Sequence, residues 1–227
     1  PEITSYAYSQ LILNKGVKEN FRARSQLIAD LRKFLAKEGF MEVETPILQP
    51  LAGGALAQPF KTHLNTLDLD MYLRIAPELY LKRLLVGGFE KIFEIGKVFR
   101  NEGIDAEHLQ DYLQMEFYWA YADYEELMNF IEDYYRFIVK ETFGTTKTQR
   151  GKRQIDWGKN WPKIDYLDSF RQQTGIDLSK NPTLESLYKM AEQVGAKPHK
   201  KMREGRLIDL IYKKAIKPKI QEPSFLT

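Results

Sequence analysis

Segment 93–124 carries the polar residues whose types and spacing are best suited to chemistry. Two stretches that alternate as strands do flank a loop at Gly103, and alternation places every second side chain on one face. Antiparallel pairing of the two stretches brings five polar side chains to one surface: Arg100, Glu102, Gln114, Glu116 and Tyr118. A guanidinium there suits a phosphate oxygen, and carboxylates suit an amine. From spacing alone, the same residues equally fit a solvated sheet face with an Arg–Glu pair.

A further candidate carboxylate, Glu78, follows the sequence Arg74-Ile75-Ala76-Pro77. Pro77 suits the start of a helix, which places Glu78 in the first helical turn at the edge of the preceding strand. A carboxylate is favoured there by the free N–H groups and the helix dipole. Glu78 therefore fits either a binding site at the sheet edge or simple helix capping.

The elements that must hold these residues are predicted mainly from the spacing of apolar side chains. We expect helices over 21–38, 78–86, 125–142, 165–173, 183–194 and 205–216. We expect strands over 40–46, 69–75, 92–100 and 113–121, the last with a core face of Leu113, Met115, Phe117, Trp119 and Tyr121. Residues 1–20 are expected to form an irregular arm, with Gly16 as a breaker. The glycine- and alanine-rich segment 49–58 is expected to be a loop where backbone approaches a ligand.

The composition excludes several classes of protein. The 227 residues are 43% hydrophobic and 29% charged, which is typical of a globular protein. The absence of cysteine excludes a disulfide framework, a thiolate zinc site and a cysteine nucleophile. No stretch of 18 uncharged apolar residues and no secretory signal are present, so we expect no membrane partner and a cytoplasmic location.

Charge is distributed unevenly along the chain. Residues 102–133 contain ten acids and no Lys or Arg, whereas 146–163 contain six basic residues and one acid. Residues 195–220 contain nine basic residues and two acids. These stretches fit solvated helix faces and loops, or else an acidic pocket for a cation together with a basic surface for a polyanion.

Three runs, Gly39–Pro46, Tyr72–Phe89 and Phe93–Tyr124, together resemble the class II aminoacyl-tRNA synthetases, specifically the lysyl-tRNA synthetases of subclass IIb. The resemblance implies an α+β fold in which an antiparallel sheet is flanked by helices. It also implies an N-terminal arm or linker over 1–20 and a catalytic core with motifs 1 and 2 over 21–145. A helical insertion, leading into the second half of the catalytic domain, is then expected over 146–227.

The resemblance implies a lysine–tRNA ligase, which forms lysyl-adenylate from ATP and lysine and then transfers lysine to tRNA(Lys). Phe99–Gly103 (FRNEG) resembles motif 2, whose arginine, here the catalytic residue Arg100, contacts the α-phosphate and the substrate carboxylate. Glu102 is then expected on the adenine amino group, Tyr112 stacked on adenine and His108 on the β- and γ-phosphates. The implied ATP-binding residues are Arg100, Glu102, His108, Tyr112 and Gln114. The implied lysine-binding residues are Gly54, Glu78, Glu116 and Tyr118.

The resemblance also implies partners and cofactors. Glu44-Thr45-Pro46 resembles the end of motif 1, whose proline lies at a dimer interface, so we expect a homodimer with Pro46 at the contact. ATP and Mg²⁺ are the implied cofactors. The magnesium ligands are expected in the C-terminal half of the catalytic domain, and no metal site is expected among the residues given.

The sequence departs from the family pattern in several places. Leu109 replaces an asparagine of the motif 2 loop, Gln58 replaces an arginine and Leu64 replaces a histidine. Nothing before residue 20 fits an anticodon-binding barrel, and no glycine-rich segment with an arginine fits motif 3. We therefore expect a sheet that is incomplete at the C-terminus. We also expect a truncated catalytic fragment that is weakly active or inactive alone, or that takes motif 3 from a second chain.

Two alternatives stay open. A lysine ligase that modifies a protein, such as an elongation factor, fits the absence of a barrel, although 53–60, 75–88 and 120–124 match lysyl-tRNA synthetases closely. A non-catalytic, synthetase-like interaction module fits the absence of motif 3. Against that module stand four site residues that a decayed site would not keep: Arg100, Glu102, Glu78 and Glu116.

Overall fold

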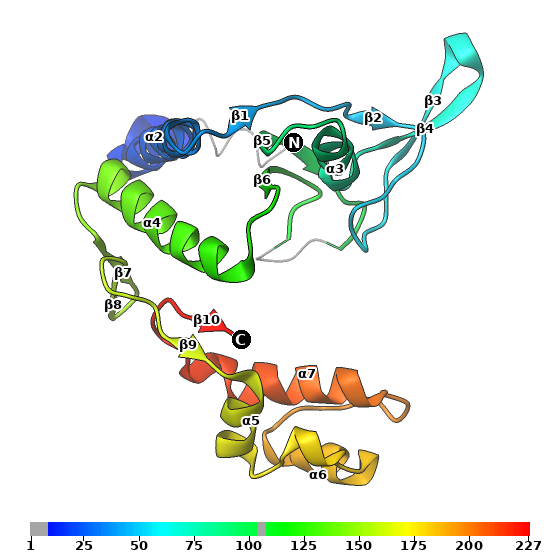
Figure 1. Cartoon of the computed structure of the whole chain (residues 1–227), viewed down its shortest axis with the longest axis vertical. Helices are drawn as coiled ribbons and strands as arrows, with labels where there is room; N and C mark the ends of the chain where they lie inside the picture. Colours follow the sequence, from blue (N-terminus) through cyan, green and yellow to red (C-terminus); the bar gives the residue numbers. More distant parts are fainter. Residues whose placement is uncertain (1–8, 104–107) are drawn as a thin grey trace. The chain divides into compact units, whose positions relative to one another are not determined.

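The structure, a computed structural model, describes residues 9–103 and 108–227, and the chain divides into two compact units (Figure 1). Unit 1 ends at Asn129, and unit 2 comprises Phe130–Thr227. Positions 1–8 of the expected arm lie outside the described residues, as do Asp105 and Glu107 of the acid-rich stretch. The division of the chain at residue 145 into a catalytic core and an insertion stays a prediction.

The described part of unit 1 contains two small sheets and several helices. In chain order these are α2 (Lys15–Lys37), β1 (Met41–Glu42), β2 (Leu48–Gln49), β3 (Lys61–Leu64), η1 (Asn65–Leu67), β4 (Leu69–Leu73), α3 (Glu78–Val86), β5 (Lys91–Phe99), β6 (Asp111–Trp119) and the start of α4 (Tyr124–Phe143). One sheet has the order β1-β5-β6, with β5 and β6 antiparallel, and the other has the antiparallel order β2-β4-β3. The predicted α+β class with antiparallel sheets and flanking helices is confirmed.

Helix α2 begins earlier than the sequence indicated. It starts at Lys15 rather than residue 21, and residues 9–13 are helical as well, so the expectation of an irregular arm is wrong for these positions. The reason is local, because the side chain of Asn14 accepts a hydrogen bond (3.1 Å) from the N–H of Gly16 and caps the helix. An N-terminal cap offsets the low helix propensity of a single glycine in the first turn.

The sheet β1-β5-β6 packs on an aromatic side chain from the short connection after α2. Phe40, which follows α2, lies edge-on against Phe117 (5.4 Å between ring centres) and Trp119 (6.0 Å) of β6. The strand expected over 40–46 pairs over only two residues with β5, at Met41 and Glu42. This packing fixes one face of β5 and β6 and leaves their other face for the site described below.

The expected core position of Tyr121 is wrong. Strand β6 ends at Trp119, and Tyr121 lies in the following turn with φ of 65° and 94% of its surface exposed. A left-handed backbone conformation interrupts the alternation, so the side chain no longer continues the core face of the strand.

Unit 2 joins a small hairpin to a helical cluster. Its elements are the remainder of α4, β7 (Lys147–Arg150), β8 (Arg153–Asp156), β9 (Lys163–Ile164), α5 (Tyr166–Thr174), η2 (Leu178–Lys180), α6 (Leu184–Gln193), α7 (Glu204–Ala215), η3 (Lys217–Lys219) and β10 (Phe225–Leu226). The antiparallel hairpin β7–β8 was not predicted, and β10 pairs in parallel with β9. The core of this unit lies among the helices and includes Phe170, Leu187, Ala191, Leu207 and Ile211.

Aromatic packing ties the hairpin segment of unit 2 to α4. The ring of Trp157 stacks on Tyr135 (5.3 Å), and Trp161 lies against both Tyr135 (5.4 Å) and Phe225 (5.3 Å). The indole N–H of Trp157 also donates a hydrogen bond (2.8 Å) to the hydroxyl of Thr148. Among the described residues, no helix has both the length and the apolar character needed to span a bilayer.

Candidate active site

The register of β5 against β6 brings the predicted site residues to one face. Glu94 lies opposite Glu116, and Val98 lies opposite Tyr112. The pairing continues to Arg100, whose backbone N–H donates to the carbonyl of Gln110 (2.7 Å). Because alternate residues of paired strands share a face, Arg100 and Tyr112 lie on the same side as Glu116. The predicted antiparallel pairing is therefore confirmed, and we call this surface the β5–β6 face.

A cleft of about 380 Å³ lies at the open end of the β5–β6 face. Four of the five predicted ATP-binding residues line it, together with two neighbours: Arg100, Glu102, His108, Tyr112, Gly103 and Leu109. The guanidinium of Arg100 lies over the ring of Tyr112, with 5.5 Å between its central carbon and the ring centre. The fifth residue, Gln114, does not line the cleft.

The side chain of Arg100 has hydrogen-bonding capacity that the protein does not use. Within the described part of the chain, its Nε is buried and has no hydrogen-bond partner. A buried donor without a partner costs free energy. The cleft therefore combines a cation, an aromatic ring and a carboxylate, which suits a nucleotide.

Further along β6, carboxylates gather on the same face. The carboxylate of Glu116 accepts hydrogen bonds from the hydroxyl of Tyr118 (3.2 Å) and from the side-chain amide of Gln114. Burial raises the pKa of Glu116, and the nearby charges of Glu78 and Glu94 raise it further, while the two hydrogen bonds act in the opposite direction. Burial likewise raises the pKa of Tyr118, so its hydroxyl stays protonated and remains a donor.

Glu78 reaches this cluster from the start of α3, as the sequence predicted. Its carboxylate is partly exposed and pairs with the ammonium of Lys82 (2.5 Å) one turn later. The loop at Gly54 lies directly on it, because a Cβ added to Gly54 would come within 2.9 Å of the Cβ of Glu78. Gly54 also has φ of +87°, which glycine adopts readily. The predicted lysine-binding residues Gly54 and Glu78 therefore lie in contact.

A buried ion pair beneath the β5–β6 face was missed from the sequence. Arg74 and Glu94 form a salt bridge in which only 2% and 4% of the side chains are exposed. The guanidinium of Arg74 also donates to the carbonyl of Lys97 (2.7 Å) and to the hydroxyl of Thr45 (3.1 Å), and that hydroxyl donates to Glu94 (2.6 Å). We call Arg74, Glu94 and Thr45 the Arg74 network. This network connects the segment before α3 with strand β5. Through Thr45 it also connects both with residues 44–46, the segment that resembles the end of motif 1.

Two signals in the sequence point to this network. Arg74 and Glu94 stand among apolar residues in predicted strands, where a charge is rarely buried unless it is paired. Gly96 lies inside the strand β5, and glycine there marks close approach by another group. The structure supplies that group, because a Cβ on Gly96 would overlap the guanidinium of Arg74.

Comparison with known proteins decides the family. A family model described as tRNA synthetases class II (D, K and N) matches residues 2–225. The chain belongs to this family. It is 44% identical over 219 residues to the lysine–tRNA ligase of Roseiflexus sp. (strain RS-1), covering 96% of this chain and 45% of that protein. It is 44% identical over 223 residues to the lysine–tRNA ligase of Cronobacter sakazakii, covering 97% of this chain and 44% of that protein. The chain thus spans somewhat under half the length of these curated relatives.

In this class II synthetase chain, the residue predicted to lie at a dimer interface is exposed. Pro46 accepts a hydrogen bond at its carbonyl from the side chain of Gln49 (3.0 Å), which shapes the turn into β2. Apolar side chains around it are also exposed: Met41, Ile47, Leu48 and Leu51. A homodimer through this surface stays a prediction.

The described residues of this synthetase chain contain no group of three or more His, Asp or Glu side chains placed to hold a metal ion. No step below depends on a metal ion.

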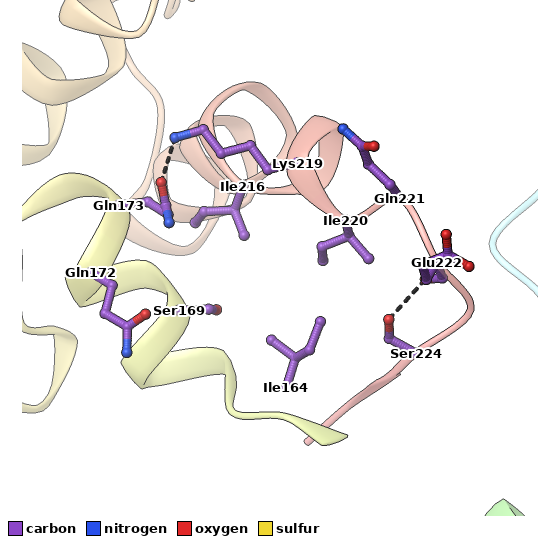
Figure 2. A pocket seen from close by; sticks show the side chains of 10 residues that line it. All are labelled: Ile164, Ser169, Gln172, Gln173, Ile216, Lys219, Ile220, Gln221, Glu222 and Ser224. Atoms are coloured by element: carbon purple, nitrogen blue, oxygen red, sulfur yellow. Dashed lines mark hydrogen bonds between the residues drawn. The ribbon is translucent and has the colours of Figure 1, made fainter. Parts of the chain in front are cut away.

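Unit 2 contains a larger opening of about 500 Å³, between α5, η3 and the C-terminal segment (Figure 2). Its walls are mainly apolar and amide side chains, including Ile164, Gln172 and Gln221, and Lys219 bonds to Gln173. None of the predicted site residues lies there. Size alone therefore does not identify the candidate site, which is defined by the chemistry of the β5–β6 face.

Proposed function

We propose that this chain takes part in lysine activation by a lysine–tRNA ligase. In that reaction a carboxylate oxygen of lysine attacks the α-phosphorus of ATP, and pyrophosphate leaves, giving lysyl-adenylate. A terminal hydroxyl of tRNA(Lys) then attacks the carbonyl carbon, and AMP leaves. Both steps need substrates held in line and negative charge neutralised, rather than a nucleophile from the protein.

In this proposal the cleft at the end of the β5–β6 face holds the nucleotide. Arg100, which lines the cleft, neutralises charge on the α-phosphate and contacts the substrate carboxylate. Tyr112 stacks on adenine, Glu102 accepts from its amino group, and His108 contacts the outer phosphates. The placement of all four around one cleft supports these roles.

The carboxylates of the same face select the substrate in this proposal. A lysine ammonium needs hydrogen-bonding carboxylates when it leaves water, since an unpaired buried charge is costly. Glu116 meets that need, because its carboxylate is partly buried on the β5–β6 face and lies close enough to Glu78 and Glu94 for their charges to act on it. Tyr118 and Gln114 orient its oxygens. This half-buried carboxylate cluster is the observation that carries the proposal.

Glu78 already binds an ammonium group, which the protein itself supplies. Its carboxylate holds the ammonium of Lys82, which is more than half exposed and can move aside. Gly54 lies against Glu78 and allows the loop backbone to approach a bound ligand. The remaining predicted features, namely tRNA(Lys) as acceptor, ATP with Mg²⁺, a homodimer and a cytoplasmic location, belong to the same proposal.

Calorimetric titration with a non-hydrolysable lysyl-adenylate analogue, lysyl-sulfamoyl adenosine, tests the proposal. We expect Glu116→Gln and Glu78→Gln each to weaken binding about 10- to 100-fold, because each removes a charge-assisted hydrogen bond worth about 1.5–3 kcal/mol. Glu90→Gln is the matched control, since Glu90 is exposed and no side-chain partner or role in the site is assigned to it. Equal affinity in all three variants would contradict the assignment, and tight binding of a protein partner without analogue binding would favour an interaction module.

A further inference from the structure

The two basic stretches of the sequence meet at one place on unit 2. A pocket of about 410 Å³ is lined by three cations of the hairpin β7–β8 and by a fourth cation from η3, more than sixty residues later in the chain. These side chains are Arg150, Lys152, Arg153 and Lys217, and all are exposed. No acidic residue lines the pocket. We call these four residues the hairpin cations.

The hairpin itself concentrates like charges. Arg150 and Arg153 lie directly opposite each other in the β7–β8 register, and the two residues between them are Gly151 and Lys152. Gly151 has φ of +60°, which allows the tight turn. Like charges directly opposite each other on paired strands destabilise the pairing. An anion bound at the tip would relieve that repulsion.

Other cations of the same unit are compensated by the fold. Arg171 pairs with Asp168 (2.8 Å) and Lys213 pairs with Asp209 (2.7 Å), both along a helix. Within the described residues, none of the hairpin cations takes part in an ion pair. What distinguishes the hairpin cations from other unpaired cations of unit 2 is that they gather around one pocket that no acidic residue lines.

Features of the surroundings favour an extended anion over a single phosphate group. Apolar residues, including Ile155 and Ile220, also line the pocket, which suits the face of a ribose or base. A further opening of about 360 Å³ on unit 2 is also cationic, and His199, Lys201, Arg203 and Arg206 line it. Repeated cationic openings suit a chain of phosphates.

We propose that the hairpin cations bind the phosphodiester backbone of RNA, forming a contact surface on unit 2 in addition to the candidate active site. The choice of RNA as the polyanion rests on the proposed function. Backbone contacts of this kind give affinity without sequence preference and position the nucleic acid for a reaction elsewhere. Their strength depends strongly on salt, because each neutralised phosphate releases condensed counterions.

The salt dependence of RNA binding gives the expected size of the loss in affinity when hairpin cations are removed. Each phosphate contact contributes about 0.7–0.9 to the slope of log K against log salt concentration. Removing three cations should therefore reduce that slope by about 2–3. Relative to 1 M salt, where the electrostatic contribution vanishes, this slope change predicts binding that is about 100- to 500-fold weaker at about 0.1 M salt.

The test is fluorescence anisotropy of the full chain with a fluorescein-labelled tRNA(Lys) transcript over a series of KCl concentrations. The variant is Arg150→Gln/Lys152→Gln/Arg153→Gln. The matched control is Lys140→Gln/Lys159→Gln/Lys189→Gln, which removes the same charge from exposed positions of unit 2 that line neither cationic opening. Circular dichroism of both variants checks that the fold is retained, which we expect because all six side chains are exposed.

We expect the hairpin variant to lose both affinity and salt slope and the control to keep most of each. Equal slopes for the two variants would overturn the proposal, because net charge alone would then explain RNA binding. A second titration uses inorganic tripolyphosphate in place of RNA. The proposal would also be overturned if the chain bound tripolyphosphate saturably while the hairpin variant bound RNA as tightly as the unaltered chain. Titration of both variants with lysyl-sulfamoyl adenosine separates this outcome from failure of the proposed function, because the hairpin cations lie outside the β5–β6 face.

Discussion

Removing Arg74 should destabilise unit 1 strongly, since its guanidinium compensates a buried charge. In Arg74→Met the carboxylate of Glu94, 4% exposed in the unaltered chain, loses its cation. Breaking a buried pair by removing one partner costs about 3–5 kcal/mol. The double variant Arg74→Met/Glu94→Gln leaves no uncompensated charge and should recover part of this loss.

The recovery should be incomplete, and the structure indicates by how much. The guanidinium of Arg74 also donates to the carbonyl oxygens of Lys97 (2.7 Å) and Thr45 (3.2 Å), and methionine leaves both without this donor. Each unsatisfied acceptor costs about 1–3 kcal/mol, less where water can enter. We therefore expect the double variant to stay about 1–3 kcal/mol less stable than the unaltered chain. The coupling energy between positions 74 and 94 should be about 2–3 kcal/mol.

Urea unfolding followed by tryptophan fluorescence measures these values for unit 1 alone. Of the three tryptophans, only Trp119 lies in unit 1, and it packs on Phe40 beside β5. A background of Trp157→Phe/Trp161→Phe therefore makes the signal specific to this unit. A loss below about 1 kcal/mol for Arg74→Met, or a coupling energy near zero, would refute the view that the Arg74 network holds the site together.

Two further predictions concern the β5–β6 face, and Gly205 of unit 2 supplies the comparison for the first. Gly96→Ala should destabilise unit 1 by about 1–3 kcal/mol in urea unfolding, because the added methyl group overlaps the guanidinium of Arg74. Gly205→Ala, in the first turn of α7 with open space around it, should change the stability of unit 2 by less than about 0.5 kcal/mol. Because burial raises the pKa of Glu116 above 4.5, folding favours its protonated form, and stability falls as pH rises from 4.5 through the raised pKa. Glu116→Gln removes this loss, so its stability relative to the unaltered chain should increase over that pH interval; a difference that does not change with pH would show that Glu116 titrates normally.

The strands and helices that carry the candidate site were predictable because their patterns are strong. Helix α3 has the predicted bounds, Glu78–Val86, since Pro77 marks its start and the glycines after Val86 mark its end. The strands β5 and β6 lie within two residues of their predicted ends, because alternation over nine residues leaves little freedom in register.

Other features depended on contacts that a linear pattern does not contain. The hairpin β7–β8 has mostly exposed residues on both faces, so no alternation of apolar and polar side chains marked it. The Arg74 network joins residues 20 to 49 positions apart, and only the fold brings them together.

The central claim is that the β5–β6 face recognises a cationic side chain on an adenylate. The most direct test compares lysyl-sulfamoyl adenosine with norleucyl-sulfamoyl adenosine, which has the same chain without the ammonium, by calorimetry on the unaltered chain. One charge-assisted contact predicts a preference for the lysyl analogue of about 10- to 100-fold. Equal affinity for the two analogues, or binding of neither, would contradict the account.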